Sequence, residues 1–261
     1  MTGEKLIKAI SELAVQAGKL FEESEKVKQI EVKEGHANFV TLIDKQVQAL
    51  LEARLPLLVP GSRMIGEEDA ERSPLTDEPT WIVDPVDGTT NLIHDYRHSV
   101  VSIALVQNKR PVLGLIYCPY TQEMFTAVRG EGAFLNGRPI HVSDQPFERA
   151  LVGVETSPYN PELADRNLTL MGRYHLACAD IRVLGSAALA LAYLAAGRTD
   201  AFCALRLLPW DVAAGAVLIE EAGGIFDMPL TGEGPVYDRP AAVLAGSPTC
   251  FESAKQLFLE V

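Results

Sequence analysis

The amino-acid sequence predicts a layered α/β sandwich. Strand-like runs dominate residues 63–142, and strand-like and helical patterns alternate after Pro146. With 261 residues, of which 48% are hydrophobic, the chain can bury a full core as one large domain or as two tightly packed halves. We place the boundary between the halves near residues 143–149, which gives the segments 1–145 and 146–261.

Two amphipathic helices are expected to open the first half. Apolar residues recur at helical spacing over residues 3–26 and 41–55, and the second helix is expected to end before Pro56. Strand-like runs follow at 63–65, 81–83, 99–107, 112–117 and 123–128. Between two further runs, 133–135 and 139–142, the dipeptide Asn136-Gly137 is a strong signal for a hairpin turn.

The second half is expected to alternate between strands and helices. Strands are predicted at 150–156, 181–184, 200–205 and 241–245, and helices at 161–178, 186–196, 212–221 and 249–259. The segment 186–196 is rich in Ala and Leu on all sides, which indicates a buried helix, and Gly197 is placed to cap it.

The charge of the chain argues against some classes of partner. With Lys+Arg 23 against Asp+Glu 35, the net charge is −12, so non-specific binding to nucleic acid or to an anionic membrane is not expected. No apolar run approaches the ~18 residues that span a bilayer, and residues 1–5 show no signal-peptide pattern. The four cysteines form no C-x-x-C pair, which favours free thiols in a reducing compartment. We therefore expect a soluble, cytoplasmic protein.

Four carboxylates, Glu67, Asp84, Asp87 and Asp211, each follow an apolar or aromatic stretch that is expected to be buried. Carboxylates gathered at the ends of buried elements repel one another unless a positive charge lies between them. A hard divalent cation such as Mg²⁺, which prefers oxygen ligands, is the usual solution. These residues therefore predict metal-dependent phosphate chemistry, in which the metal also attracts an anionic substrate to an acidic protein.

The segment from Asp84 to Asn91 is the most informative motif. Asp84-Pro85 and Asp87-Gly88 alone are ordinary turn dipeptides. However, Thr89-Thr90-Asn91 has the composition of a helix start, and a helix N-terminus offers unpaired backbone N–H groups to a phosphate. We interpret the segment as two metal-chelating carboxylates beside a phosphate-binding turn.

Simpler explanations exist for the other acidic residues. Glu67 lies in an acidic run that is typical of a solvated loop, and Asp211 can interact with the first turn of a helix. Thr41-x-x-Asp44 matches a capping box, although Asp44 borders the inward stripe, where a carboxylate is costly unless it is paired or functional. The histidines lack metal-ligand spacing, and the sequence contains no P-loop and no G-x-S-x-G motif.

Taken in order, the motifs resemble those of the inositol monophosphatase family of lithium-sensitive, magnesium-dependent phosphomonoesterases. They are Gly66-Glu67-Glu68, residues 84–91, Trp210-Asp211-Val212-Ala213-Ala214-Gly215 and Glu221-Ala222-Gly223-Gly224. The similarity runs from the N-terminal helix to the last strand. It implies an αβαβα sandwich of the sugar-phosphatase type, and we also expect a homodimer.

The resemblance implies roles for individual residues. Those expected to hold two or three Mg²⁺ ions are Glu67, Asp84, Val86 (through its carbonyl), Asp87 and Asp211. Those expected to act in catalysis are Asp44, Glu67 and Thr89. Those expected to contact the substrate are Asp87, Gly88, Thr89, Gly185, Ser186, Ala187 and Asp211. Arg206 is added to them from its own position in the sequence and not from the resemblance.

One position departs from the family pattern. Members specific for inositol phosphates carry a Glu seven residues before the last metal-binding Asp, where this chain has Ala204. Arg206, which is expected on the same face of an extended segment, could instead meet a second phosphate. We therefore expect myo-inositol 1-phosphate to be hydrolysed no better than a bisphosphate or a phosphorylated nucleotide.

The expected reaction is in-line attack on phosphorus by a metal-activated water, without a covalent enzyme intermediate. Fructose 1,6-bisphosphate, a nucleotide 3′- or 2′-phosphate and histidinol phosphate are alternative substrates within the same superfamily. Two alternatives belong to other classes: a regulatory protein that uses this fold to bind a macromolecule, and a structural cation-binding protein.

Overall fold

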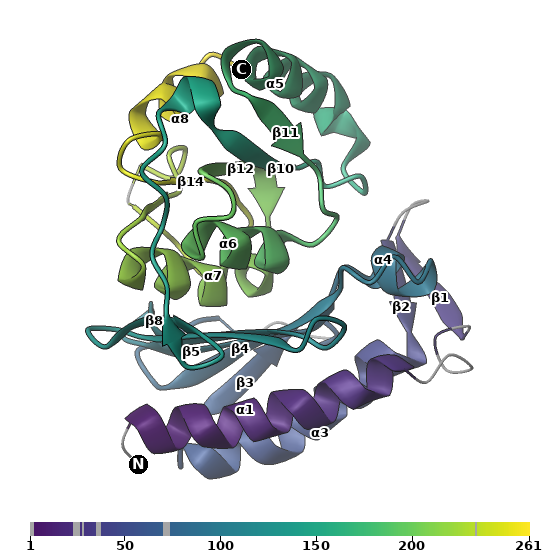
Figure 1. Ribbon diagram of the computed structural model, residues 1–261. Helices are drawn as coiled ribbons and strands as arrows, with labels where there is room; N and C mark the ends of the chain where they lie inside the picture. The colour runs from purple at the N-terminus through teal and green to yellow at the C-terminus, as the bar shows by residue number, and fades with distance from the viewer. Residues whose placement is uncertain (1–2, 23–26, 28, 35–37, 70–73, 233) are drawn as a thin grey trace.

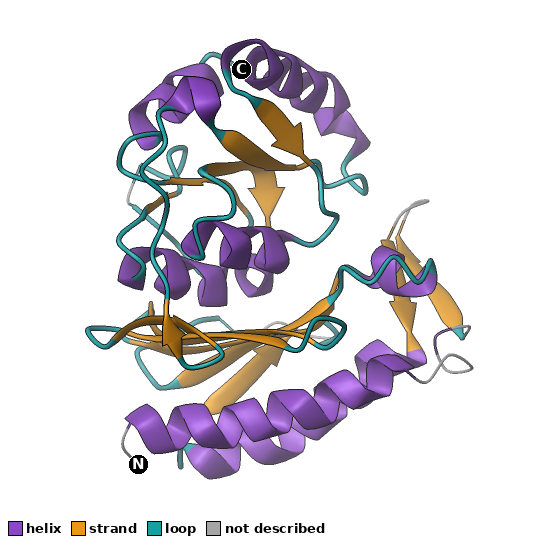
Figure 2. Cartoon of the chain, in the orientation of Figure 1, coloured by secondary structure: helices purple, strands orange, loops and turns teal. Residues whose placement is uncertain are grey.

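The computed structural model describes residues 3–22, 27, 29–34, 38–69, 74–232 and 234–261. In this part of the chain, helices and sheets stack in the order helix, sheet, helix, sheet, helix (Figure 1; Figure 2). The predicted layered α/β sandwich is confirmed, and its layers have the αβαβα order.

The first layer consists of α1 (Gly3–Lys19) and α3 (Leu42–Leu58), which cover one face of the larger sheet (Figure 1). The predicted helix 3–26 gives way to a 3-10 turn at Leu20–Glu22, and residues 23–26 lie outside the described part. The prediction that α3 ends before Pro56 is wrong. A proline in the last turn costs few hydrogen bonds, and the continued helix lets Leu58 pack against the core.

The larger sheet contains seven strands among the described residues, in the order β3-β4-β5-β6-β7-β8-β9. β3 and β4 run parallel, and the remaining neighbours are antiparallel. The strands are β3 (Arg63–Gly66), β4 (Thr80–Asp87), β5 (Val100–Gln107), β6 (Arg110–Cys118), β7 (Glu123–Val128), β8 (Gly132–Leu135) and β9 (Arg138–Pro139). The predicted runs from 63–65 to 133–135 form strands, and β4 extends four residues beyond its predicted end to include both aspartates of the motif.

The predicted hairpin turn is present between β8 and β9. Asn136 and Gly137 have φ angles of 49° and 77°, which are the positive values that a two-residue hairpin turn of this type requires. The second strand of the hairpin is shorter than predicted, because β9 ends at Pro139.

The middle layer, α6 (Ala187–Ala195) and α7 (Pro209–Glu221), lies between the two sheets (Figure 1). All residues of α6 except Tyr193 are buried, as the composition of 186–196 predicts, and α7 is buried from Pro209 to Ile219. Gly197 (φ 68°) follows the end of α6 and donates its N–H to the Leu194 carbonyl at 2.9 Å, which confirms the predicted cap. A Cβ at Gly114 on β6 would collide with the backbone of Ala214, so this glycine allows α7 to approach the larger sheet closely.

The smaller sheet has the order β11-β10-β12-β14-β13 and is covered on its outer face by α5 (Ala164–Ala177) and α8 (Phe251–Leu259) (Figure 1). Its strands are β10 (Leu151–Glu155), β11 (Asp180–Arg182), β12 (Ala201–Leu207), β13 (Ile225–Asp227) and β14 (Ala241–Gly246). Short 3-10 turns at Phe147–Arg149 and Pro161–Leu163 precede β10 and α5. β13 was not predicted.

A hairpin of β1 (Ile30–Glu34) and β2 (Asn38–Thr41), also not predicted, extends from the layers at the end where α3 begins (Figure 1). The chain leaves the larger sheet at Pro139 and enters the smaller one at Leu151, but α6 and α7 share one hydrophobic core with both sheets. The division into segments 1–145 and 146–261 therefore stays a prediction. Within the described ranges, no helix has the length and hydropathy that crossing a membrane requires.

Candidate active site

A pocket of about 300 Å³ opens where the C-terminal end of β4 meets the short helix α4 (Thr89–Ile93) and the first turns of α6 and α7. It contains most of the residues that the sequence singled out. The predicted site residues that line it are Glu67, Asp84, Val86, Asp87, Gly88, Thr89, Gly185, Ala187 and Asp211.

Asp84 and Asp87 reach this pocket from the same strand because β4 contains a β-bulge between them. Asp84 pairs with Ser102 on β5 whereas Asp87 pairs with Val100, so β4 has one more residue than its partner in this interval. In a regular strand, residues three apart point to opposite faces. The extra residue brings both carboxylates to the same side.

Asp211 completes a group of three buried carboxylates. One oxygen from each of Asp84, Asp87 and Asp211 lies within 4.8 Å of the others. Asp211 lies in the first turn of α7, where its Oδ2 accepts the N–H of Leu208 at 2.7 Å. The sequence left open whether Asp211 stabilises the helix start or belongs to the acidic cluster, and it does both.

The acidic group carries a large electrostatic penalty. Burial, together with the charges of Glu67, Asp87 and Asp211, raises the pKa of Asp84 well above its ordinary value. Burial and the charge of Asp87 do the same to the pKa of Asp211. Burial raises the pKa of Asp87 only to about 6, since Ser186 Oγ (2.6 Å) and the N–H of Ala188 (2.7 Å) donate to its Oδ2.

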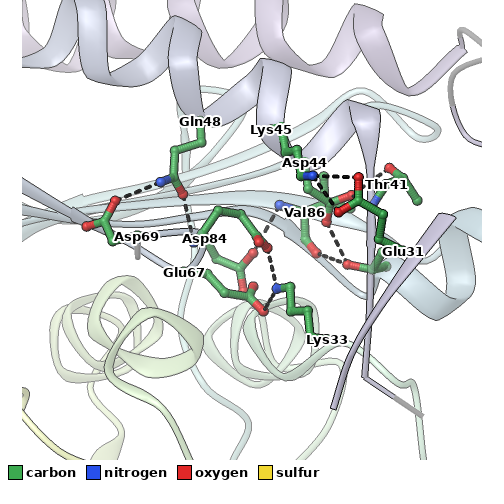
Figure 3. A network of polar contacts seen from close by, with 12 residues as sticks. Glu31, Lys33, Thr41, Asp44, Lys45, Gln48, Glu67, Asp69, Asp84 and Val86 are labelled. Carbon is green, nitrogen blue, oxygen red and sulfur yellow. Dashed lines mark hydrogen bonds and ion pairs between the residues drawn. The ribbon is translucent and has the colours of Figure 1, made fainter. Parts of the chain in front are cut away.

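Glu67 lies at the edge of the same pocket, directly after β3. Its Oε1 is 2.9 Å from the ammonium of Lys33 on β1, which also contacts Glu68 (Figure 3). Although burial opposes it, the charges of both glutamates raise the pKa of Lys33. Burial and the charge of Glu67 raise the pKa of Glu68 to about 7. Glu67 is thus partly exposed and forms an ion pair with Lys33, whereas the three aspartates are buried.

The loop that carries Glu67 is held by a buried glutamine on α3. Gln48 Nε2 donates to Asp69 Oδ1 at 2.8 Å, and Gln48 Oε1 accepts the N–H of Glu68 at 2.9 Å (Figure 3). Asp69 Oδ2 in turn accepts the N–H of Gly66 at 2.8 Å. These bonds fix the backbone on both sides of Glu67, which is why a residue in an acidic loop faces the pocket.

Asp44 connects the start of α3 to the phosphate-suited turn. Its Oδ2 accepts the N–H (2.8 Å) and Oγ1 (2.6 Å) of Thr41, which confirms the capping box (Figure 3). Its Oδ1 lies 2.8 Å from Thr89 Oγ1, which is also 3.0 Å from the Val86 carbonyl. Burial raises the pKa of Asp44, so this fully buried carboxyl can hold a proton more readily than an exposed one.

Gly88 precedes α4 in a conformation that requires glycine. Its φ is 93°, and an added Cβ would lie 2.9 Å from the His98 carbonyl oxygen and 3.1 Å from the Gly185 carbonyl oxygen. The predicted helix start at Thr89 is confirmed. The amides of Gly88 and Thr89 therefore border the pocket at a tight turn beside the carboxylates.

The segment 184–187 forms the opposite wall of the pocket. Gly185 and Ala187 line it, whereas Ser186 caps α6 and donates to Asp87. The side-chain amide of Asn91 on α4 donates to the Leu184 carbonyl at 2.8 Å and also lies 2.9 Å from the His98 carbonyl. Asn91 thus joins the turn after β4 to this wall.

Two pocket residues were not singled out from the sequence. Glu155 ends β10 and is 8% exposed, and burial together with the charge of Asp87 raises its pKa to about 8. Tyr159 lines the same wall, and burial raises its pKa too. Glu155 closes a strand-like run in the sequence, as the other acidic candidates do, but no motif marks it.

Arg206 lies elsewhere than the sequence suggested. Ala204 pairs with Val243 and Leu207 with Ala241, so β12 has a bulge that ends the alternation on which a shared face for Ala204 and Arg206 depended. Arg206 is exposed and lines a separate hollow with Glu162, Leu163 and Arg239. The geometry gives no support to a contact between Arg206 and a second phosphate in the carboxylate pocket.

A comparison with known sequences decides the family. The sequence profile of the inositol monophosphatase family matches residues 3–258, nearly the whole chain. The chain belongs to the inositol monophosphatase family. It is a phosphatase, that is, a phosphoric monoester hydrolase of a family that acts on small phosphate esters.

Individual members of the inositol monophosphatase family cover almost the same length. Inositol monophosphatase 2 of Solanum lycopersicum is 38% identical over 252 residues, which is 94% of either chain. Nus factor SuhB of Escherichia coli K12 is 38% identical over 217 residues, covering 83% of this chain and 80% of that one. The crystal structure of extragenic suppressor protein suhB from Bartonella henselae matches with a TM-score of 0.87 and 31% identity, covering 97% of this chain and 98% of that one.

The acidic group fits the metal dependence of the inositol monophosphatase family. Its donors are all carboxylate oxygens, which hard divalent cations prefer, and they are buried close enough to share one ion. Their raised pKa values show the cost of leaving this charge without a cation.

Proposed function

We propose that this protein is a Mg²⁺-dependent phosphomonoesterase that hydrolyses the phosphate ester of a small sugar, inositol or nucleotide. The observation that carries the proposal is the buried group of Asp84, Asp87 and Asp211 beside the turn at Gly88 and Thr89 in one pocket. Carboxylates alone suit any divalent cation. Backbone amides at the same pocket supply donors for an anion, and together they suit a phosphate ester.

The residues proposed to hold two or three Mg²⁺ ions are Glu67, Asp84, Val86 (through its carbonyl), Asp87 and Asp211. When bound there, Mg²⁺ would act as a Lewis acid that lowers the pKa of water and offsets the charge of the phosphoryl group.

The protein's own groups would position the reactants. The amides of Gly88 and Thr89 would hold the phosphate, with Asp87 and Asp211 next to it. Thr89 Oγ1, with Asp44 at 2.8 Å, would orient the attacking water, and Asp44, whose pKa is raised by burial, could take up a proton through it. Glu67, on the remaining side of the pocket, would complete the catalytic set.

The segment Gly185, Ser186 and Ala187 is proposed to face the alcohol part of the substrate. Gly185 and Ala187 line the pocket directly, while Ser186 would act by holding Asp87 in place. Arg206 is left out of this proposal because it lines a different hollow.

A screen of the purified protein against a panel of phosphate monoesters tests the proposal. Turnover of at least one ester in Mg²⁺ is expected, and it should stop when EDTA is in excess. Li⁺ is expected to inhibit by occupying the ion site at Asp84, Asp87 and Asp211 after hydrolysis and slowing the release of phosphate. Full activity in excess EDTA would contradict the metal-dependent mechanism, whereas insensitivity to Li⁺ would contradict only the inhibition.

Other substrates of the same superfamily are tested in that panel, namely fructose 1,6-bisphosphate, nucleotide 3′- and 2′-phosphates and histidinol phosphate.

A regulatory binding role is the second candidate, because a relative that is 38% identical carries the name Nus factor SuhB. It predicts binding that persists in a variant without turnover, such as Asp84→Asn. We also propose that the protein is a homodimer, which light scattering would measure, and that it is cytoplasmic.

A further inference from the structure

We propose that Glu155 determines substrate specificity by binding a hydroxyl group of the substrate's alcohol. The inference rests on the proposed phosphatase function and adds the group that recognises the alcohol. Glu155 is the one carboxylate among the pocket-lining residues given above that has no part in the proposed metal site or in the orientation of the attacking water.

The position of Glu155 makes it available to a ligand in the pocket. It is the last residue of β10, and it lines the pocket together with Tyr159 and Gly185. Only 8% of the residue is exposed. A carboxyl group that lines a pocket and is itself nearly buried can contact what fills the pocket with little competition from bulk solvent.

Strand pairing makes Glu155 the polar group on this part of the smaller sheet. Glu155 lies directly beside Ala204 on β12, so the two side chains share one face of the sheet. Ala204 is fully buried and presents only a methyl group. Of this pair, only Glu155 lines the pocket, whereas Ala204 belongs to the hydrophobic core.

The carboxyl group of Glu155 is held in a fixed orientation. Its Oε1 accepts the N–H of Leu184 at 3.2 Å and the N–H of Gly185 at 3.0 Å. A third backbone N–H, that of Ser186, also bonds to this carboxyl group. Because an ionised carboxylate offers about four acceptor sites, at least one of them stays available to a substrate hydroxyl. On the other side of this segment, Asn91 holds the Leu184 carbonyl at 2.8 Å. A group fixed on both sides in this way loses little freedom when a ligand binds.

The same bonds set the distance between the hydroxyl site and the phosphate turn. The Gly185 carbonyl oxygen lies 3.1 Å from the ideal Cβ position of Gly88, so the segment that Glu155 supports touches the proposed phosphate site. An ester with its phosphate at Gly88 and Thr89 would therefore lie next to the segment that Glu155 holds.

The test compares two esters that differ in their hydroxyl groups, myo-inositol 1-phosphate and cyclohexyl phosphate, in Mg²⁺. In Glu155→Gln, the remaining oxygen is expected to keep the two N–H groups of the segment, which places an NH₂ group at the pocket. Turnover of cyclohexyl phosphate should then stay within about 2-fold of wild type, while kcat/KM for the inositol ester falls about 10-fold, mainly through KM. Glu155→Ala should lose the preference as well and also slow both esters.

Glu162→Gln is the matched control, since Glu162 is exposed, follows Glu155 by seven residues and lines the other hollow. It should leave the ratio of the two kcat/KM values unchanged. A folded Glu155→Gln variant that keeps the wild-type ratio, or loses both activities equally, would overturn the inference. A wild-type protein that hydrolyses both esters equally well would do the same. Hydrolysis of no ester in the wider panel would instead overturn the proposed function.

Discussion

Asp84 and Asp87 lie three residues apart on β4, and a β-bulge between them directs both carboxylates into one pocket. Pro85 lies inside this interval, where a residue without a backbone N–H removes no regular ladder bond. The acidic site thus depends on a local irregularity of the strand. Asp211 meets the pair from the start of α7, which is packed against the larger sheet.

We expect the protein to be markedly more stable in Mg²⁺ than in EDTA. The ion would bind the folded state only and offset the repulsion of Asp84, Asp87 and Asp211, so the free energy of unfolding should rise by about 3 kcal/mol at an ion concentration of about 100 times Kd. Differential scanning calorimetry in Mg²⁺, in EDTA and in Na⁺ of equal ionic strength checks this. Equal Tm values in all three would contradict a divalent site.

Asp84→Asn separates the metal site from the fold. The variant removes one charge from a buried cluster that has no cation in EDTA, so its metal-free form should be as stable as wild type or about 1 kcal/mol more stable. Turnover should fall by at least about 100-fold, because the carboxylate would contact the metal. Denaturant unfolding in EDTA and initial rates in Mg²⁺ measure the two effects.

Asp77→Asn, a change of an exposed aspartate before the same strand, is the control for Asp84→Asn and should alter neither quantity. Wild-type turnover in Asp84→Asn would show that the metal assignment is wrong. A large loss of stability in EDTA would show that the charge of Asp84 supports the fold.

The metal-free protein should become more stable as the pH falls from 8 to 5. The pKa of Asp87 is raised to about 6 in the folded state, and those of Asp84 and Asp211 are raised further. A raised carboxyl pKa means that the folded state binds the proton more tightly. The stability that this proton adds to the folded state is fully present below the unfolded-state pKa near 4. It is lost as the pH rises through the pKa of the folded state.

Bound Mg²⁺ should reverse this dependence, since protons and the ion compete for the same oxygens. Tm measured every half pH unit, with EDTA or with Mg²⁺, shows both slopes. In Asp84→Asn the slope in EDTA should be smaller. A wild-type Tm in EDTA that falls steadily as the pH is lowered would contradict the raised pKa values.

How much of the site could be predicted depended on local signals. The acidic triad and Gly88 were found from sequence because each follows a buried run in a compact motif. Glu155 was missed because its place in the pocket depends on pairing with Ala204 and on bonds to a segment 29 residues away, which no local pattern records. Arg206 was misplaced because strand alternation was extended through a bulge.

Which elements of the fold could be predicted also depended on local signals in the sequence. Periodicity found α1, α3 and the long strands, whereas the short hairpin β1–β2 was missed because it is mostly exposed, with Val32 61% exposed, and buries little apolar surface. Pro56 was given too much weight, because α3 continues past it to Leu58, which packs against the core.

Asn91→Asp should destabilise the protein by about 2–3 kcal/mol at pH 8. The Asn91 amide donates toward the carbonyls of His98 and Leu184, and a carboxylate there would face two acceptors without a proton to share. Asn108→Asp, on an exposed turn, is the control and should cost less than about 0.5 kcal/mol. Urea unfolding measures both, and equal losses would show that the Asn91 bonds contribute little.

Gly88→Ala tests whether the phosphate turn tolerates a side chain. The φ of 93° alone costs a non-glycine residue about 1–2 kcal/mol, and the new Cβ would also press on the carbonyl oxygens of His98 and Gly185 at 2.9 and 3.1 Å. Gly130→Ala is the matched control, since Gly130 has φ 80° and open space around its Cβ position. The difference between the two variants therefore isolates the close approach.

Gly88→Ala is expected to lose about 1–2 kcal/mol more stability than Gly130→Ala in urea unfolding. Because the turn would shift away from Gly185, inhibition by inorganic phosphate should weaken at least about 10-fold, while Gly130→Ala should bind phosphate as wild type does. Equal stability losses in the two variants would mean that the turn relaxes without strain. Unchanged phosphate inhibition in Gly88→Ala would mean that the anion lies elsewhere in the pocket, away from the amides of Gly88 and Thr89.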